Sequence, residues 1–256
     1  EGKLQVELAQ HQYLLPRLAG QWSHLERLGG GIGTRGPGES QLETDKRLIN
    51  KKINYLKKKL EEVRKHRSLH RQQRRKSGIA TASLVGYTNS GKSSLLNALS
   101  TQEAVLVADK LFATLDPTTR RIRLADSASL LLSDTVGFIR KLPPAIIDAF
   151  RATLEELTEA DLLIHVVDIT SVNATEQCQT VEKILKELKV DNKPRITALN
   201  KIDLLLDDEK EWSEQEALDN ITEWTGLRLA DTIFISAEKK WGLRHLEDAL
   251  TRALPK

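Results

Sequence analysis

The sequence predicts an antiparallel pair of α-helices in residues 1–76, followed by an α/β domain with a mostly parallel sheet in residues 77–256. From Ile79 onward, short apolar runs alternate with amphipathic stretches, which is typical of strands alternating with helices. Before that point, apolar residues recur every three or four positions in two long stretches, as in paired helices. The run 29–38, which separates these stretches, has six glycines in ten residues and fits neither a helix nor a strand.

The composition fits an ordinary globular protein, with 39% hydrophobic and 29% charged residues. The single cysteine, Cys178, excludes an internal disulfide, and no apolar run is long enough to span a bilayer. The chain begins at Glu1 and contains no methionine, so we expect a piece of a longer protein. We expect a monomer in the cytoplasm, or in an organelle if a targeting segment has been removed.

Positive charge is concentrated in residues 51–76, which hold 12 Lys and Arg against 2 Asp and Glu. Because the whole chain carries only +3, the rest of it is acidic overall. A basic segment on an acidic body predicts contact with a polyanion such as nucleic acid, and the alternative is a solvated helix face. The basic residues predicted to contact nucleic acid include Lys57, Lys58, Lys59 and Arg64.

The first helix is predicted over residues 4–28, with a kink at Pro16, where the chain lacks a hydrogen-bond donor. Ser40 and Glu43 have the spacing of a capping box, so the second helix is expected to begin there and to reach about Lys76, roughly 55 Å away. The glycine-rich run then forms the tip of a hairpin, or alternatively a disordered linker. The tip residues predicted to meet a polyanion are Gly29, Gly30, Gly31, Gly33, Arg35, Gly36 and Gly38.

The stretch IATASLVGYTNSGKSSLLNALS reads as a strand, a glycine loop and a helix, which is the context that a phosphate-binding P-loop requires. Loop amides and the helix N-terminus would face the phosphates. Lys92 would neutralise the β- and γ-phosphates, and the Ser93 hydroxyl would coordinate Mg²⁺. The predicted phosphate-binding residues are Gly86, Tyr87, Thr88, Asn89, Ser90, Gly91, Lys92, Ser93 and Ser94.

The run NKID follows another predicted strand and indicates which base is bound. The Asp203 carboxylate can accept two hydrogen bonds from guanine, whereas adenine has no matching pair of donors. Asn200 would reach the other edge of the base, and a loop amide near Ala237 would meet the guanine oxygen. The predicted base-binding residues are Asn200, Lys201, Ile202, Asp203, Ser236, Ala237 and Glu238.

A third motif, DTVG, follows the strand SLLLSD, and its residues Asp134, Thr135, Val136 and Gly137 are predicted to meet the nucleotide. Asp134 would hold Mg²⁺ through water, and the Gly137 amide would contact the γ-phosphate; the alternative is a plain turn.

A threonine should complete the Mg²⁺ shell, and the candidates are Thr114, Thr118 and Thr119. Phe138 stands where many GTP hydrolases use a glutamine to orient water, so hydrolysis should be slow without a partner. His165, inside a predicted strand, is read as a core residue.

These motifs resemble those of translation-factor-related P-loop GTPases, and in particular the HflX family. The resemblance is carried by GGGIGTRGPGESQLETDKR, GYTNSGKSSLLNAL, LFATLDPTTR, DTVGFIRKLP and NKID, in this order. It implies that Thr114 is the Mg²⁺-coordinating threonine, within the nucleotide-binding run Phe112, Ala113, Thr114, Leu115 and Asp116. It also implies that Lys92, Thr114 and Gly137 support the transition state, and that position 138 is hydrophobic; no catalytic base is assigned.

By the same resemblance, the expected activity is GTP hydrolysis with Mg²⁺ as cofactor, stimulated by the large ribosomal subunit. The GTP-bound form would split stalled 70S ribosomes into subunits, with the glycine tip near the peptidyl-transferase region of the rRNA. Two alternatives stay open: an assembly or RNA-remodelling GTPase that acts on immature rRNA, and a GTP-controlled protein-binding module.

Overall fold

The computed structural model falls into two compact units, one ending at Lys76 and the other beginning after it. The residues that the structure describes are 2–28, 37–76, 78–100, 118–124, 129–135, 137–138, 157–207, 210–226 and 232–254. None of the helices in these ranges is long and apolar enough to cross a membrane.

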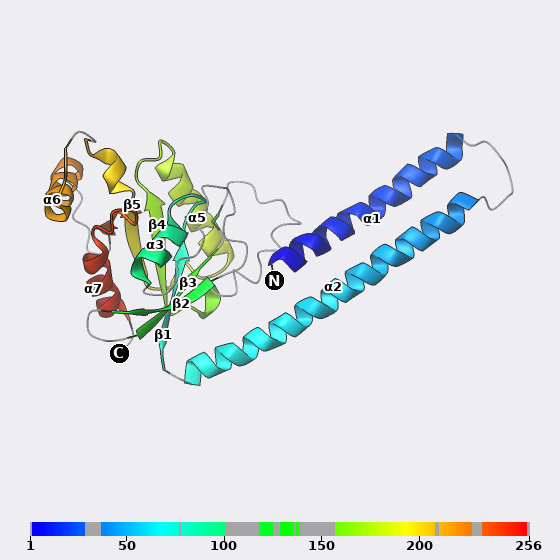
Figure 1. The fold of residues 1–256 in the computed structure, drawn as a ribbon, viewed down its shortest axis with the longest axis horizontal. Coiled ribbons are helices and arrows are strands. Elements are labelled where there is room, and N and C mark those ends of the chain that lie inside the picture. Colours follow the sequence, from blue (N-terminus) through cyan, green and yellow to red (C-terminus); the bar gives the residue numbers. More distant parts are fainter. Residues whose placement is uncertain are drawn as a thin grey trace. The chain divides into compact units, whose positions relative to one another are not determined.

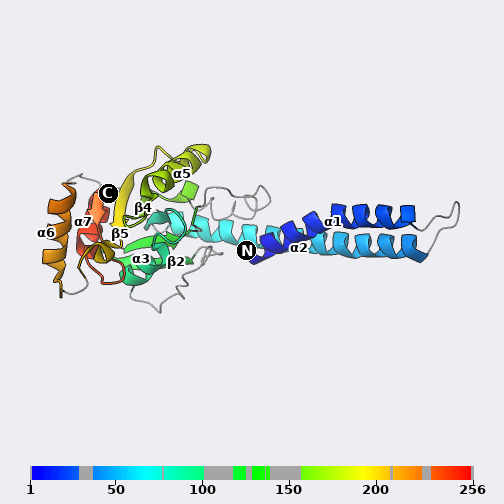
Figure 2. The ribbon, with the colours of Figure 1, turned by 90° about the horizontal axis from the view of Figure 1, so that it is seen from above.

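The first unit consists of two helices, α1 (Gly2–Leu28) and α2 (Pro37–Lys76), which lie antiparallel and side by side (Figures 1 and 2). The side chains of Ile53, Leu56 and Leu60 are buried, at the spacing of three and four that the sequence predicts. Lys52 on α2 also forms an ion pair with Glu7 on α1, with Nζ and Oε1 2.9 Å apart. The predicted helical pair is therefore confirmed in its described part.

The start of α2 differs from the expectation, because the helix begins at Pro37 rather than near Ser40. Proline suits the first turn of a helix, where its missing N–H would have no intrahelical partner and its φ is already helical. Gly38, predicted as part of the tip, therefore lies within α2. In the other helix, Pro16 lies on an exposed position of α1, and the helix continues through it.

The second unit is built on a six-stranded sheet in the order β2-β3-β1-β4-β5-β6. Neighbouring strands are parallel except for β2 and β3, which are antiparallel, so the predicted mostly parallel sheet is confirmed. The strands are β1 (Ala80–Val85), β2 (Thr118–Arg123), β3 (Ser129–Asp134), β4 (Leu162–Asp168), β5 (Arg195–Asn200) and β6 (Thr232–Phe234).

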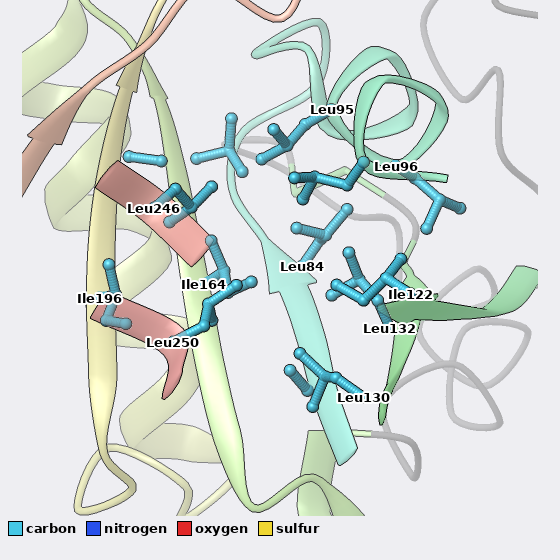
Figure 3. Close-up of a cluster of buried hydrophobic side chains, with 14 of the residues drawn as sticks. Leu84, Leu95, Leu96, Ile122, Leu130, Leu132, Ile164, Ile196, Leu246 and Leu250 are labelled. Atoms are coloured by element: carbon cyan, nitrogen blue, oxygen red, sulfur yellow. The ribbon is translucent and has the colours of Figure 1, made fainter. Parts of the chain in front are cut away.

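Helices cover both faces of this sheet because successive strand residues point to opposite sides. On one side, Leu84 and Ile164 pack against residues of α3 and α7, among them Leu95 and Leu246 (Figure 3). On the other side, Val85 belongs to a second apolar cluster that includes residues of α5. The helical segments are α3 (Lys92–Leu99), α5 (Ala174–Glu187), the 3₁₀ turn η1 (Ile202–Leu205), α6 (Glu214–Thr225) and α7 (Leu243–Ala253).

His165 lies in β4 and is 5% exposed, as expected for a core residue. Burial lowers the pKa of its imidazole to about 4, and the nearby positive charges of Arg195 and Lys92 act in the same direction. The ring is therefore neutral at physiological pH and contributes packing.

Because β1, β3, β4 and β5 are parallel neighbours, their carboxyl ends lie at one edge of the sheet. Ligands of open α/β sheets bind at this edge, next to the loops that follow the strands on either side of a central strand. The sequence places Asp134, Asp168 and Asn200 at the last positions of β3, β4 and β5.

Candidate nucleotide-binding site

The loop between β1 and α3, residues 86–91, turns sharply at the carboxyl edge of the sheet. Gly91 has a φ of 92°, and a Cβ at this position would overlap Nδ2 of Asn200. Glycine is therefore required at position 91 by both backbone conformation and close approach. The loop ends at the N-terminus of α3, where backbone N–H groups without intrahelical partners favour a bound anion.

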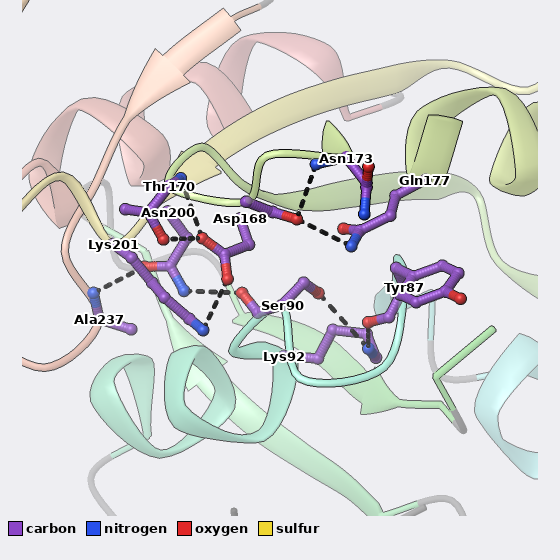
Figure 4. Close-up of polar contacts among 11 residues, drawn as sticks. Tyr87, Ser90, Lys92, Asp168, Thr170, Asn173, Gln177, Asn200, Lys201 and Ala237 are labelled. Atoms are coloured by element: carbon purple, nitrogen blue, oxygen red, sulfur yellow. Dashed lines mark hydrogen bonds and ion pairs between the residues drawn. The ribbon is translucent and has the colours of Figure 1, made fainter. Parts of the chain in front are cut away.

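Lys92 directs its ammonium group back into this loop (Figure 4). Its Nζ donates to the carbonyl oxygen of Tyr87 at 2.6 Å and to Oγ of Ser90 at 3.5 Å. The residue is only 6% exposed, and burial lowers the pKa of the amine to about 8, although the Asp134 carboxylate opposes this shift. A buried amine in a loop rich in N–H donors is suited to hold phosphate oxygens.

Ser93 and Asp134 form the predicted metal-binding pair of the site. The Ser93 hydroxyl donates to Oδ2 of Asp134 at 2.6 Å, and the Asp134 side chain is buried at the end of β3. Thr135, the next residue, is anchored by a hydrogen bond from its Oγ1 to the Leu84 carbonyl oxygen at 2.5 Å. A hydroxyl and a carboxylate side by side supply hard oxygen donors, so these residues fit Mg²⁺.

Gly137 lies against the phosphate-binding loop. A Cβ at position 137 would come within 2.7 Å of Cα of Thr88 and 3.0 Å of Nζ of Lys92. This close approach requires glycine and brings the backbone of the DTVG motif next to the amine expected to meet the γ-phosphate.

The backbone of Phe138 is hydrogen-bonded to the phosphate-binding loop, and its side chain packs in the core. Its N–H donates to the Gly86 carbonyl oxygen at 3.0 Å, and its carbonyl oxygen accepts from the Thr88 N–H at 2.9 Å. The ring is 3% exposed and lies in the apolar cluster of Val85 and Leu163. A phenyl ring in this position does not orient water, in agreement with the reading of the sequence.

Asn200 connects the phosphate-binding loop to the loop after β6. Its Nδ2 donates to the Ser90 carbonyl oxygen at 2.9 Å, and its Oδ1 accepts from the Ala237 N–H at 3.0 Å (Figure 4). The sequence predicts that Asn200 meets an edge of the base and that a loop amide near Ala237 meets the guanine oxygen. In the structure the two groups bind each other and brace two loops, and their contacts with a base stay a prediction.

Asp203 lies in η1, next to Ile202, whose fully buried side chain anchors this turn. The Asp203 side chain is half-buried, and within the described ranges its carboxylate accepts no hydrogen bond. Nearby, the Ser236 hydroxyl accepts from the Lys239 N–H at 3.0 Å, which shapes the loop that contains Ala237 and Glu238. An anchored carboxylate with open acceptors is suited to bind paired N–H donors of a ligand.

Asp168 and Thr170 belong to the site although the sequence analysis did not single them out. Oδ2 of Asp168 lies 2.7 Å from Nζ of Lys201, and Oδ1 accepts from the N–H and hydroxyl of Thr170 at 3.0 and 2.6 Å. Burial alone would raise the pKa of Asp168, but the Lys201 and Thr170 hydrogen bonds hold it below its usual value. The signal in the sequence that could have identified Asp168 is a carboxylate at the last position of a predicted parallel strand.

We expect Asp168→Asn to weaken GTP and GDP binding by about the same factor, roughly 5- to 20-fold. A neutral amide leaves the Lys201 ammonium without its charged partner, and such losses cost about 1–2 kcal/mol. Titration with a fluorescent guanine nucleotide measures the effect. Glu182→Gln, which removes an ion pair with Arg195 elsewhere on the sheet, is the matched control. Unchanged affinity in Asp168→Asn would show that the Lys201 contact does not position the lysine for binding.

Comparison with known proteins places the chain in a family. Residues 1–74 match the family model described as GTP-binding GTPase Middle Region, residues 81–201 match 50S ribosome-binding GTPase, and residues 149–256 match Elongation factor Tu GTP binding domain. GTPase HflX of Caldanaerobacter subterraneus subsp. tengcongensis is 51% identical over 254 residues, which cover 99% of this chain and 55% of that protein. The chain belongs to the HflX family of GTPases.

Two further comparisons agree with this placement. GTPase HflX of Escherichia coli strain K12 is 46% identical over 99% of this chain and 57% of that protein. A GTP-binding protein from the archaeon Sulfolobus solfataricus, solved in complex with GDP, is 29% identical with a TM-score of 0.58, over 98% of this chain and 66% of that one. The chain thus spans about half the length of its HflX relatives.

Several residues that were predicted to bind the nucleotide or a polyanion lie outside the described ranges. These are Phe112, Ala113, Thr114, Leu115, Asp116 and Val136, together with the tip residues Gly29, Gly30, Gly31, Gly33, Arg35 and Gly36. The other two threonine candidates, Thr118 and Thr119, lie in β2, where Thr119 Oγ1 is 2.8 Å from Ser133 Oγ. On α2, Lys57, Lys58 and Lys59 are exposed, and the Arg64 side chain is outside the description.

Proposed function

We propose that this chain binds GTP with Mg²⁺ and hydrolyses it to GDP and phosphate. The observation that carries the proposal is the Asn200 brace, because it joins the loop around Lys92 to the loop around Ala237. The phosphate-binding and base-binding groups thereby form a single site, with Asp203 beside it. The triphosphate would lie along loop 86–91, and the guanine would bind to Asp203.

Each residue has a distinct part in the proposed reaction. Lys92 holds the β- and γ-phosphates and balances charge that develops as the γ-phosphate leaves. The Gly137 N–H and a hydroxyl of Thr114 orient the γ-phosphate. The metal would be held directly by Ser93 and Thr114, and through water by Asp134. A bound Mg²⁺ would neutralise charge on the phosphate oxygens.

Phe138 leaves the attacking water without a glutamine partner, so unaided hydrolysis should be slow. The buried phenyl ring has no hydrogen-bond donor or acceptor to offer the water, which supports this expectation. A second macromolecule that orders the site is therefore part of the proposal.

We infer that this second macromolecule is the ribosome, chiefly the 50S subunit and its rRNA, and that the GTP-bound form separates 70S ribosomes into subunits. Two observations support the inference. The family model over residues 81–201 describes a 50S ribosome-binding GTPase, and α2 ends in the basic segment 51–76. In this proposal residues 1–76 form the RNA-binding arm, residues 77–256 the GTP-binding domain, and the protein acts as a cytoplasmic monomer.

A GTPase assay with and without purified 50S subunits tests the proposal. We expect slow hydrolysis by the chain alone and an increase of at least tenfold with 50S subunits, because a partner that completes a GTPase site can raise the rate by about 10³- to 10⁵-fold. Sedimentation of 70S ribosomes with the chain and a non-hydrolysable GTP analogue tests splitting. A clear preference for ATP, or equal binding of 50S subunits with GTP, with GDP and without nucleotide, contradicts the proposal.

Sedimentation also separates the alternatives. Binding to precursor subunits alone would indicate an assembly factor, and partners that resist nuclease treatment would indicate a protein-binding module.

A further inference from the structure

The outer surface of α2 carries an aromatic side chain between two cations. Tyr55 is 53% exposed, and Nζ of Lys52 and of Lys59 lie 5.8 and 5.7 Å from the centre of its ring. These distances lie within the range of a cation–π contact. The two ammonium groups thus flank an accessible tyrosine ring.

This arrangement follows from helix geometry. Leu48, Lys52, Tyr55 and Lys59 are spaced four, three and four residues apart, so they line one side of α2. We call these four residues the Tyr55 stripe. Lys52, Tyr55 and Lys59 each come one residue before a residue of the buried seam, so the stripe lies about 100° around the helix from that seam. Leu48 is 57% exposed, which extends the apolar surface by two turns.

The other helix of the hairpin adds to the same side. Lys52 in the stripe contacts Glu7 on α1, so this side of α1 adjoins the stripe. Leu14 is two helical turns from Glu7, on the same side of α1, and is 44% exposed. The hairpin therefore presents one aromatic ring, two exposed leucines and two lysines on one surface.

We propose that the Tyr55 stripe binds an unpaired RNA nucleotide, with the base stacked on the Tyr55 ring and an adjoining phosphate neutralised by Lys59. The inference rests on the proposed interaction with rRNA and names the kind of rRNA element that this surface takes. An exposed ring stacks on any base, whereas lysines contact the backbone phosphates. Charge complementarity favours RNA over a protein helix, because Lys52, Tyr55 and Lys59 lie in the segment 51–76, with its 12 basic and 2 acidic residues.

Geometry favours an unpaired nucleotide over a duplex. The bases of an A-form helix are stacked on each other, and its major groove is too deep and narrow for side chains to read. A ring on the convex surface of a helix can stack only on a base that is splayed out, as in a loop or bulge.

The test uses the full chain and a short unstructured RNA that carries 2-aminopurine, whose fluorescence reports stacking. We expect Tyr55→Ala to weaken binding about fivefold or more, with loss of the stacking signal, while the slope of affinity against salt stays the same. Tyr55→Phe keeps the ring and should retain both. Lys59→Gln should reduce the salt slope by about one. A duplex of the same length should bind equally to the wild type and to Tyr55→Ala.

Leu69→Ala is the matched control, because Leu69 is 59% exposed on the same basic helix and has no ring. Circular dichroism and GTP hydrolysis without ribosomes should be unchanged in all these variants. If Tyr55→Ala and wild type bind the RNA with equal affinity and equal 2-aminopurine signal, the proposal is wrong. If Tyr55→Ala then still loses affinity for 50S subunits, the stripe docks a ribosomal protein instead.

The oligonucleotide assay keeps this inference separate from the proposed function. If the wild type binds 50S subunits in a GTP-dependent way and Tyr55→Ala is fully active, only the proposal for the Tyr55 stripe is rejected. Failure of the wild type to bind 50S subunits would reject the proposed ribosomal function, whatever the oligonucleotide shows.

Discussion

Lys92→Ala is expected to reduce GTP hydrolysis by about 100-fold or more and to weaken nucleotide binding. The lysine is the buried cation of the phosphate-binding loop, held between the Tyr87 carbonyl oxygen and the Ser90 hydroxyl. Its removal leaves the β- and γ-phosphates without a neutralising charge as the phosphoryl group leaves. Single-turnover hydrolysis and titration with a fluorescent nucleotide separate the two effects.

Lys193→Ala is the matched control for this variant. Its ammonium donates to the carbonyl oxygens of Thr158 and Ala160, at 2.9 and 2.5 Å, in the loop that precedes β4. This variant also loses an anchored lysine, so its thermal stability should fall while its nucleotide affinity stays near that of the wild type. Equal hydrolysis by Lys92→Ala and wild type would exclude the proposed site.

Because of Lys92, we expect the affinity for guanine nucleotides to depend on pH. Burial lowers its pKa to about 8, and bound phosphates raise it again, so the complex binds protons more tightly than the free protein. Guanine nucleotide affinity should therefore be constant below about pH 8 and fall by up to about tenfold per pH unit above it. Fluorescence titrations across this range measure the slope. Lys92→Ala should lack it, and a wild-type affinity independent of pH would contradict the assignment.

Asp203→Asn should exchange base preference, weakening GTP by about 100-fold and improving binding of xanthosine triphosphate. In the proposed complex the carboxylate would accept hydrogen bonds from the N1–H and amino group of guanine, while an asparagine amide would meet the amino group donor to donor. Xanthine has an oxygen at that position and accepts the amide hydrogen. The change should leave the phosphate-binding loop intact, because the Asn200 brace is separate from Asp203.

Competition between the two triphosphates against a fluorescent guanine nucleotide measures this exchange. Asp207→Asn, an exposed residue four positions on, is the control and should retain the preference for GTP. If GTP binds Asp203→Asn as tightly as wild type, Asp203 does not read the base.

The parts of the site that could be read from the sequence are those set by spacing within one element. Gly91, Lys92 and Ser93 follow one another at the junction of β1 and α3, so their motif alone places them together. The seam at Ile53, Leu56 and Leu60 follows from the period of one helix. The start of α2 was harder to read, because Pro37 and Ser40 both supply a local signal for a helix start.

The parts of the site that could not be predicted from the sequence depend on contacts between residues far apart in the chain. Ser90 and Ala237 are far apart in the sequence, and both bind Asn200, so its side chain serves as a brace. Asp168 and Lys201 meet because β4 and β5 are adjacent parallel strands that end at the same edge. No periodicity or motif encodes either pair.

The amino-acid pattern alone thus determined the phosphate-binding motif, the aspartate that is predicted to bind the base, and the paired helices, because each depends on the order of nearby residues and on local backbone geometry. Which polar groups bind each other, and that the Phe138 ring is buried in the core, was decided by the packing of strands distant in the chain. Buried polar groups must find partners wherever the fold brings them, and those partners depend on how the elements pack together.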